Sequence, residues 1–173
     1  MRSLLACLTT AAAVLGGLTG AAPSAQAAVA ADSGTFNVLS YNVAGLPEAI
    51  SSAPTPRESS TTTIGQRIAS YDVVHAQEDF NYHALLYAAD TAHPYRTPTS
   101  GGAAVGSGLN SLSKLPYDED DFERVRWNNC TLGSGDCLTP KGFTFMRERL
   151  AEGVYVDFYN LHTNAGTNDD DLA

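Results

Sequence analysis

Three short runs rich in β-branched and aromatic residues constrain the fold most, because each carries a polar side chain at or near its end. The runs are residues 35–47, which contain Asn42, residues 72–78, which end at Glu78, and residues 153–162, which end at His162. Such runs predict strands of a largely buried sheet. Neighbouring strands deliver their end residues to one edge of a sheet, so we expect Asn42, Glu78 and His162 to lie together.

The rest of the chain predicts a layered arrangement of strands and helices. Strands are expected at residues 36–43, 72–77, 108–116, 122–127, 142–150 and 154–161, and helices at residues 61–70 and 80–89. Turn-forming residues predict loops at 54–60 and 97–108, the second at the rim of a site. Ala-Glu-Gly at 151–153 predicts a hairpin. This order predicts an α/β fold class with mixed or antiparallel sheets.

The first 27 residues are typical of a secretory signal peptide. Arg2 supplies a positive charge, Leu4–Leu18 is apolar, and Ala25-Gln26-Ala27 is a small-x-small cleavage sequence. The apolar run is shorter than the roughly 20 residues that span a bilayer, so no stable membrane span is predicted. We therefore expect a secreted protein in which residues 28–34 form a short linker.

The chain is acidic, with 10 Lys and Arg, 19 Asp and Glu, and a formal net charge of −9. Removal of Arg2 with the signal peptide takes this charge from −9 to −10. Tight binding to nucleic acid relies on Lys and Arg that neutralise phosphates, so the composition argues against a dedicated nucleic-acid-binding protein. It does not exclude a nuclease, because a metal ion can carry the positive charge.

Cys130 and Cys137 remain after the signal peptide and enclose the sequence Thr-Leu-Gly-Ser-Gly-Asp. In an exported protein this pair predicts a disulfide that closes a glycine-rich loop. A zinc site fits less well, because no other Cys or His lies nearby in the sequence. Closing so short a loop gives little entropic stabilisation, so its expected role is local order.

The three strand ends have the chemistry of a magnesium and phosphate site. A carboxylate at the end of a buried strand is costly unless it is paired or binds a cation, and Mg²⁺ needs only one or two carboxylates beside waters and substrate phosphate. We therefore predict that Glu78 and Asn42 bind the metal and that His162 and Asn42 are catalytic, the histidine by donating to phosphate or assisting proton transfer. Other interpretations stay open: Glu78 and Asp79 as a solvated pair, Asn42 shaping a turn, and His162 bonded to backbone.

Four further features are expected to be structural. His75, inside a predicted strand, is interpreted as a core histidine. The acidic run Asp118–Asp121 lacks the spacing of a calcium loop and is interpreted as a solvated turn. Lys141 and Arg147 lie before and on the predicted hairpin. Either could face a phosphate, but a surface role is expected for both.

Four motifs, taken in order, resemble the endonuclease/exonuclease/phosphatase superfamily, whose members have the deoxyribonuclease-I-like fold. They are Leu-Ser-Tyr-Asn-Val-Ala-Gly-Leu-Pro47, Asp-Val-Val-His-Ala-Gln-Glu78, Gly-Leu-Asn-Ser-Leu-Ser-Lys-Leu-Pro116 and Tyr-Asn-Leu-His-Thr163. By this resemblance Asn42 matches the family's asparagine near metal and phosphate, Glu78 its magnesium-binding glutamate, and His162 a histidine that contacts the scissile phosphate. The Gly-Leu-Pro sequence and the secretory signal are more similar to the secreted sphingomyelinase-like branch than to DNA-repair members.

The resemblance covers only the first half of the family pattern. The family fold is a four-layer α/β sandwich whose second half carries an Asp-x-Asn motif and a terminal Ser-Asp-His, and neither occurs after His162 in this sequence. We therefore expect residues 35–173 to be the N-terminal part of such a domain, truncated at the C-terminus. The expected fold is an incomplete four-layer α/β sandwich that lacks its second sheet and exposes an apolar face to a complementing C-terminal segment.

The resemblance implies a Mg²⁺-dependent phosphodiester hydrolase of the nuclease or of the phospholipase C and sphingomyelinase type. Its substrate would be a phospholipid head group, a nucleic acid or a small phosphate ester. Without the second-half histidine and aspartates the site has no evident base, so the chain is expected to be inactive or incomplete. The alternative is a catalytically silent secreted binding or interaction protein that retains the half-fold.

Overall fold

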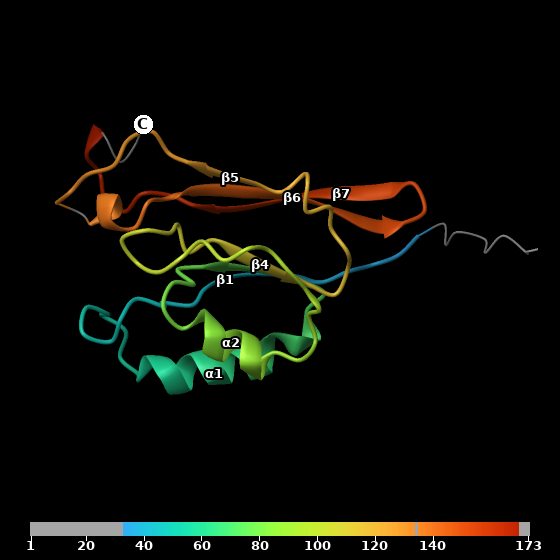
Figure 1. Ribbon diagram of the computed structural model, residues 1–173, viewed down its shortest axis with the longest axis horizontal. Coiled ribbons are helices and arrows are strands. Elements are labelled where there is room, and N and C mark those ends of the chain that lie inside the picture. The colour runs from blue at the N-terminus through green and yellow to red at the C-terminus, as the bar shows by residue number, and fades with distance from the viewer. Residues whose placement is uncertain (1–32, 134, 170–173) are drawn as a thin grey trace, which may run out of the picture.

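A computed structural model describes residues 33–133 and 135–169. The predicted signal peptide and most of the predicted linker lie outside these residues. The described chain forms three layers, namely two α-helices, a four-stranded sheet and a three-stranded sheet (Figure 1). In this part of the chain, no helix is both long and apolar enough to cross a membrane. The predicted α/β class with mixed sheets is confirmed.

The four-stranded sheet has the strand order β1-β2-β4-β3. Its strands are β1 (Val38–Asn42), β2 (Val73–Gln77), β3 (Tyr95–Arg96) and β4 (Asn110–Ser113). Because β1 is parallel to β2, and β2 antiparallel to β4, the ends of β1 and β2 and the start of β4 share one edge. The sequence does not predict β3, since two residues carry no periodicity.

Two helices cover one face of this sheet (Figure 1). They are α1 (Arg57–Arg67), which continues into the 3₁₀ turn η1 (Ile68–Ser70), and α2 (His83–Ala89). An apolar core joins helices and sheet, formed by Val43, Ile68, Val74, Ala76, Leu86 and Leu112. Burial of these side chains supplies the main stabilisation of this half of the molecule.

Both helices begin at residues other than those predicted. The predicted loop at 54–60 is wrong from Arg57 onward, where α1 begins. The Arg57 N–H at the helix start donates a 2.7 Å hydrogen bond to the carboxylate of Glu48, nine residues earlier in the chain. This bond pairs a backbone N–H that has no partner within the helix. The second helix begins at His83 rather than residue 80. Phe80 instead lies buried in the core, and the Asn81 N–H donates to the carbonyl of Gly45.

The three-stranded sheet is antiparallel and has the order β5-β6-β7. Its strands are β5 (Glu123–Arg126), with β6 (Gly142–Ala151) and β7 (Val154–His162) forming the predicted hairpin. The sheet packs through Met146 and Phe158 on Val73, on the face of the first sheet away from the helices. The expectation of a missing second sheet is therefore wrong. Inward-facing residues of the hairpin cover β2, so the chain builds both sheets itself.

Polar side chains lock the two sheets together near the shared edge. Gln77 Nε2 donates a 2.7 Å hydrogen bond to Asn160 Oδ1. Asn160 Nδ2 in turn donates to the carbonyls of Ala76 at 3.0 Å and Asn110 at 3.2 Å. One buried amide thus touches β2 and β4 from β7, which fixes the end of β7 against the ends of the other strands.

Candidate metal and phosphate site

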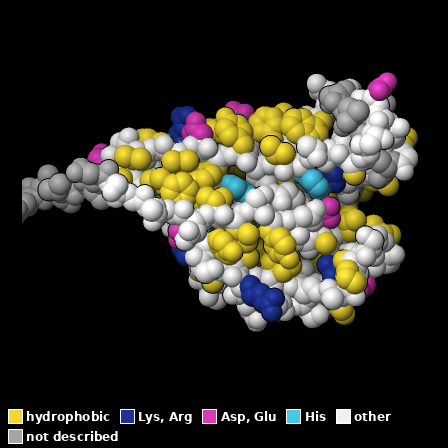
Figure 2. Space-filling model, turned by 180° about the vertical axis from the view of Figure 1, so that it is seen from behind, with side chains coloured by type: hydrophobic (Ala, Val, Ile, Leu, Met, Phe, Trp, Pro, Cys, Tyr) yellow, Lys and Arg dark blue, Asp and Glu magenta, His cyan; other side chains and the backbone are white. Residues whose placement is uncertain are grey.

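Asn42, Glu78 and His162 lie together at the shared edge of the two sheets. Asn42 Nδ2 donates a 2.9 Å hydrogen bond to Glu78 Oε1, and His162 Nε2 lies 3.8 Å from the same oxygen. The side chains of His162 and Glu78 are 18% and 22% exposed, so solvent reaches both. Figure 2 shows histidine, basic and acidic side chains side by side at this end of the molecule. The expected convergence is confirmed, and the roles of the three residues stay predictions.

The backbone holds Glu78 in an unusual conformation. Glu78 has a φ of +58°, in the left-handed region that costs a non-glycine residue roughly 1–2 kcal/mol. Its carbonyl accepts from the Gly45 N–H at 2.9 Å, and the next residue, Asp79, donates its N–H to the carbonyl of Gly108 at 2.9 Å. A Cβ on Gly45 would lie 2.4 Å from the Glu78 carbonyl oxygen, so only glycine allows this approach. Neighbouring loops therefore impose the backbone conformation that aims the carboxylate.

A buried hydrogen-bond network holds Asp79, the residue that follows Glu78. Asp79 is 1% exposed, and its carboxylate accepts a 2.8 Å hydrogen bond from Asn110 Nδ2. Burial raises the pKa of Asp79, and the bond from Asn110 opposes that rise. Asn110 Oδ1 accepts from the Ser100 N–H and from Arg124. The interpretation of Glu78 and Asp79 as a solvated loop pair is therefore wrong.

Asn42 also shapes the turn after β1, as the alternative interpretation expected. Its Oδ1 accepts a 2.9 Å hydrogen bond from the Ala44 N–H, while its Nδ2 faces Glu78. The amide oxygen is thus occupied by backbone and the amide nitrogen holds the carboxylate. This geometry makes Asn42 a positioning group for Glu78, and direct metal ligation by Asn42 stays a prediction.

His162 ends β7 with its ring in a half-buried position. Its backbone carbonyl accepts a 2.9 Å hydrogen bond from Trp127 Nε1, which fixes the strand end. Its Nδ1 is buried and has no hydrogen-bond partner among the described residues, so the interpretation of a backbone-bonded ring is not supported. Burial lowers the pKa of His162, and the charge of Lys141 lowers it further, while Glu78 raises it in part.

Lys141 lies at the site, a position that the sequence offered only as the alternative to a surface role. It is 7% exposed, in place of the expected surface role, and its Nζ lies 4.0 Å from Asp136 Oδ1 and 3.2 Å from Thr139 Oγ1. Burial lowers the pKa of Lys141, and the carboxylates of Glu78 and Asp136 raise it in part. A buried ammonium beside Asp136, within electrostatic reach of Glu78 and His162, gives this edge a cation that can face a phosphate.

The disulfide loop brings Lys141 and Asp136 into place. The predicted bond between Cys130 and Cys137 is confirmed, with an S–S distance of 2.07 Å. The neighbouring Asp136 is buried, and its Oδ2 accepts a 2.9 Å hydrogen bond from the Ala165 N–H, beyond the end of β7. The loop that places Asp136 beside Lys141 thus closes at Cys137, four residues before Lys141 in the sequence.

The remaining candidates are structural. His75 is buried, with Nδ1 2.8 Å from Ser111 Oγ, which confirms a core histidine, although its Nε2 has no partner among the described residues. Burial lowers its pKa to about 4. The turn at residues 118–121 is exposed, as expected. Arg147 is exposed and forms two hydrogen bonds with Asp157, which confirms a surface role.

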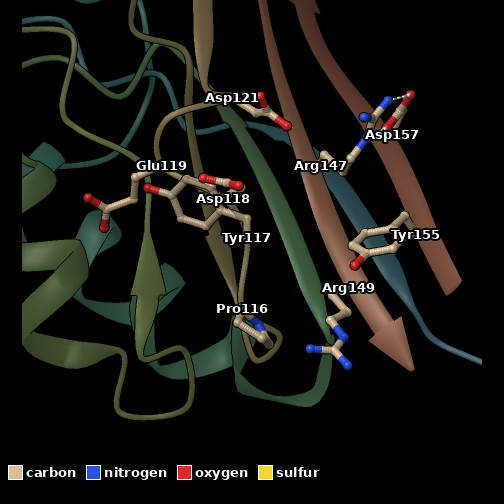
Figure 3. A pocket seen from close by; sticks show the side chains of 9 residues that line it. All are labelled: Pro116, Tyr117, Asp118, Glu119, Asp121, Arg147, Arg149, Tyr155 and Asp157. Atoms are coloured by element: carbon tan, nitrogen blue, oxygen red, sulfur yellow. Dashed lines mark hydrogen bonds and ion pairs between the residues drawn. The ribbon is translucent and has the colours of Figure 1, made fainter. Parts of the chain in front are cut away.

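A large hollow at the opposite end of the second sheet lacks the features of the site. It has a volume of about 790 Å³ and is lined by Pro116, Tyr117, Asp118, Glu119, Asp121, Arg147, Arg149, Tyr155 and Asp157 (Figure 3). Its two arginines are paired with carboxylates of their own surroundings, Arg147 with Asp157 and Arg149 with Glu152. The candidate chemistry therefore lies at the strand-end edge and not in this hollow.

The strand-end residues fit magnesium better than zinc. The described residues contain no group of three His, Cys, Asp or Glu side chains that could hold a metal ion, which argues against a zinc-type site there. Mg²⁺ keeps several waters and needs only one or two carboxylates. Glu78 offers one partly exposed carboxylate, oriented by Asn42, and this donor set suits such an ion.

Comparison with known proteins finds sequence relatives and solved structures that share this architecture. No family model matches it. Over 141 residues it is 44% identical to a sphingomyelinase of Mycobacterium tuberculosis and to one of Mycobacterium bovis, covering 78% of this chain and 28% of theirs. The chain thus spans about a quarter of the length of these relatives.

Solved structures share the fold. A hairpin-deletion mutant of the beta toxin of Staphylococcus aureus matches with a TM-score of 0.61 at 23% identity, over 79% of this chain and 53% of the toxin. Sphingomyelinase C from Streptomyces griseocarneus matches with a TM-score of 0.59 at 23% identity, over 80% and 52%. Another beta toxin mutant, solved with bound magnesium ions, matches with a TM-score of 0.60 at 22% identity, over 78% and 51%.

The fold is a deoxyribonuclease-I-like α/β architecture. Over the 141 matched residues the sequence is homologous to sphingomyelinases, in agreement with the resemblance to that superfamily.

Proposed function

We propose that the protein is the metal- and phosphate-binding part of a Mg²⁺-dependent phosphodiester hydrolase of the sphingomyelinase type. The observation that carries this proposal is the convergence of Glu78, His162 and the buried Lys141 at one sheet edge. The 44% identity to mycobacterial sphingomyelinases supports a choline phospholipid as substrate over nucleic acid. The acidic net charge of −9 supports the same choice.

Glu78 would hold the metal, with Asn42 fixing the orientation of its carboxylate. The bound magnesium of the beta toxin mutant with the same fold supports this choice of ion. When bound, Mg²⁺ would supply positive charge that polarises a phosphate oxygen. Two hydrogen bonds within the described residues position Glu78. The Gly45 N–H donates to its backbone carbonyl, and Asn42 Nδ2 donates to its carboxylate.

His162 and Lys141 would bind the phosphate on the side away from Asn42. The Lys141 ammonium would pair with a phosphate oxygen at short range in a poorly hydrated place, where such a charge-assisted bond is strong. The lowered pKa of His162 keeps its ring neutral near pH 7, so one ring nitrogen donates and the other accepts. Together they would stabilise charge that develops on the phosphoryl group.

The attacking water would be activated by groups that this sequence does not contain. The second-half Asp-x-Asn and Ser-Asp-His motifs implied by the family resemblance do not occur in the residues after His162. We propose that a complementing segment supplies them and pairs with the free edge of β1, where Val38 and Tyr41 are exposed. The disulfide and the signal-like first 27 residues support export. A catalytically silent secreted binding protein is the alternative, favoured by those same absent motifs.

Calorimetric titration with Mg²⁺ and with phosphocholine tests the site directly. The chain is expected to bind both, Glu78→Gln to lose Mg²⁺ affinity at least tenfold, and His162→Ala to lose phosphocholine affinity. Glu152→Gln, which lies at the far hairpin turn, is the matched control and should bind as the parent does. Absence of Mg²⁺ binding in the parent protein would contradict the proposed function. Release of phosphocholine from sphingomyelin by this chain alone would contradict the need for a complementing segment.

A further inference from the structure

Three polar side chains connect the second sheet to the residue that follows Glu78. On β5, Arg124 Nη2 donates a 3.2 Å hydrogen bond to the side-chain oxygen of Asn110, at the start of β4. Asn110 Nδ2 in turn donates to the Asp79 carboxylate at 2.8 Å. Asn110 is fully buried and Asp79 is 1% exposed, so solvent does not reach the bond between them. We call Arg124, Asn110 and Asp79 the cross-sheet bridge.

The bridge fixes the peptide that follows Glu78. Asn110 Nδ2 also donates to the backbone carbonyl of Asp79 at 3.2 Å, and the Asp79 N–H donates to the Gly108 carbonyl at 2.9 Å. Asp79 is thus held at its N–H, its carbonyl and its carboxylate. Glu78 has a φ of +58°, which a non-glycine residue keeps only where its surroundings impose it. Rotation of Glu78 into an ordinary conformation would swing the next peptide away from its partners.

Arg124 anchors the bridge on the second sheet. The same Nη2 donates to the carbonyls of Pro98 at 2.8 Å and Leu109 at 2.9 Å, near the two ends of the loop between β3 and β4. The Ser100 N–H, in that loop, donates to the Asn110 side-chain oxygen at 3.1 Å. The oxygen of Asn110 thus accepts from two directions, so its amide nitrogen faces the opposite way, toward the end of β2.

The polar groups of the bridge give direction more than stability. A buried carboxylate and a partly buried guanidinium lose hydration, and apolar side chains of similar volume often stabilise such a place equally well. Hydrogen bonds, unlike apolar contacts, restrict where each partner lies. The bridge therefore acts mainly on the position of Asp79 and, through the peptide bond, on that of Glu78.

We propose that the cross-sheet bridge positions the Glu78 carboxylate for Mg²⁺. Arg124 is then a positioning residue, which acts on Glu78 through the two other members of the bridge. Groups that orient a metal ligand change metal affinity by about 10–100-fold when they are removed. Mg²⁺ as the ion rests on the proposed function, whereas the residues of the bridge rest on its hydrogen bonds.

The direction of the change in affinity separates positioning from electrostatics. A positive charge near a metal site repels the ion, so removal of the Arg124 charge alone would strengthen Mg²⁺ binding. Removal of the Arg124 hydrogen bonds would release Asn110 and so weaken Mg²⁺ binding. A lower affinity for Mg²⁺ after loss of this cation therefore identifies a positioning residue.

Calorimetric titration of Arg124→Met with Mg²⁺ measures this direction. Methionine keeps an unbranched apolar stem and removes both the charge and the hydrogen bonds, so affinity is expected to fall about tenfold. Arg126→Met is the matched control, because Arg126 lies two residues away on β5 and donates to the Val105 carbonyl rather than to the bridge. Its Mg²⁺ affinity should equal or exceed that of the parent. Unchanged or tighter binding in Arg124→Met would overturn the positioning role.

Asp79 variants test the path from Arg124 to Glu78. Asp79→Ala is expected to lower Mg²⁺ affinity by a similar factor, whereas Asp79→Asn keeps an oxygen that accepts from Asn110 and should keep most of the affinity. Adding Arg124→Met to Asp79→Ala should cause no further loss, because both changes break one bridge. Additive losses would contradict this path. Equal losses in Asp79→Ala and Asp79→Asn would assign the effect to charge and contradict positioning.

Hydrogen exchange without metal separates the bridge from the proposed function. The Gly45 N–H donates to the Glu78 carbonyl, and the Asp79 N–H donates to Gly108, so these two amides report on the backbone at Glu78. In Arg124→Met both should exchange about tenfold faster than in the parent, while the amides of α1 keep their parent rates. Equal acceleration in α1 would show general destabilisation and overturn the specific role of the bridge.

The two measurements together distinguish the two proposals. If the parent binds no Mg²⁺ while the Gly45 and Asp79 amides respond to Arg124→Met, only the proposed function is contradicted. If the parent binds Mg²⁺ and Arg124→Met changes neither affinity nor exchange, only the bridge is contradicted.

Discussion

The two faces of β2 differ in what covers them. Val74 and Ala76 face the helices and lie in an apolar core with Leu112. His75 and Gln77 face the second sheet, in a layer that also buries the polar Ser111, Thr144, Glu148 and Asn160. One strand thus divides the molecule into an apolar half and a half whose interior is largely polar.

The helix side of β2 mainly stabilises the fold, whereas the polar side mainly fixes the position of β7. Apolar contacts on the helix side are non-directional, so small shifts cost little as long as the volume is filled. Buried amides and hydroxyls must meet partners of defined direction or lose their hydrogen bonds. The polar layer therefore restricts how β7 lies on β2, and with it the position of His162 relative to Glu78.

The strongest way to break the helix side is Leu112→Ala. Leu112 is fully buried between sheet and helices, and its truncation leaves a cavity. We expect the free energy of unfolding to fall by about 2–5 kcal/mol, measured by urea denaturation. Mg²⁺ affinity of the folded fraction should not change. A loss below about 1 kcal/mol would show that this core is not what holds the sheet.

Glu148→Gln tests the polar side through pH. Glu148 is completely buried in β6, neither carboxyl oxygen has a hydrogen-bond partner among the described residues, and burial raises its pKa from 4.5 to about 7. Stability from the neutral acid is present below pH 4.5 and is lost as pH rises through 7, because the folded state holds the proton more tightly.

The variant cannot charge, so its advantage over the parent should grow across this interval. We expect it to exceed the parent by about 2–3 kcal/mol at pH 8, and to match it at pH 4.5, in thermal or urea unfolding. Comparing the two proteins cancels the titration of all other groups. A constant difference between pH 4.5 and 8 would contradict a raised pKa at Glu148.

Asn160→Ala tests whether the polar layer positions β7 in addition to stabilising the fold. The substitution removes three hydrogen bonds that join β7 to β2 and β4. We expect a loss of about 1–3 kcal/mol in unfolding free energy. Phosphocholine affinity should also fall, since His162 is two residues away on the same strand. Exposed Asn128→Ala is the control, and unchanged phosphocholine binding in Asn160→Ala would contradict a positioning role for the polar layer.

The smallest effect is expected for Arg147→Ala on the outer face of the second sheet. Arg147 and Asp157 form an exposed ion pair that salt screens. The unfolding midpoint should shift only slightly, and the shift should vanish in high salt. A large loss of stability that does not depend on salt would show that the Arg147–Asp157 pair stabilises the fold as strongly as the buried polar layer.

Strand positions and the site edge followed from sequence because both depend on local patterns. Val73 and Val74 indicate a buried strand, and a polar residue directly after that strand lies at its end. The start of α1 did not follow, because the group that caps it is Glu48, nine residues earlier. The burial of Lys141 did not follow either, since residue type favours an exposed lysine and the contact with Asp136 forms only in the folded loop.

The disulfide also ties this edge to its chemical surroundings. Cys137 adjoins Asp136, which accompanies Lys141, and the same loop carries Leu132 and Leu138. In reducing solution that loop loses its covalent closure, and with it the restraint on the neighbouring ammonium group. The redox potential of the surroundings therefore sets how firmly the Lys141 ammonium and the Asp136 carboxylate are held beside the strand-end edge.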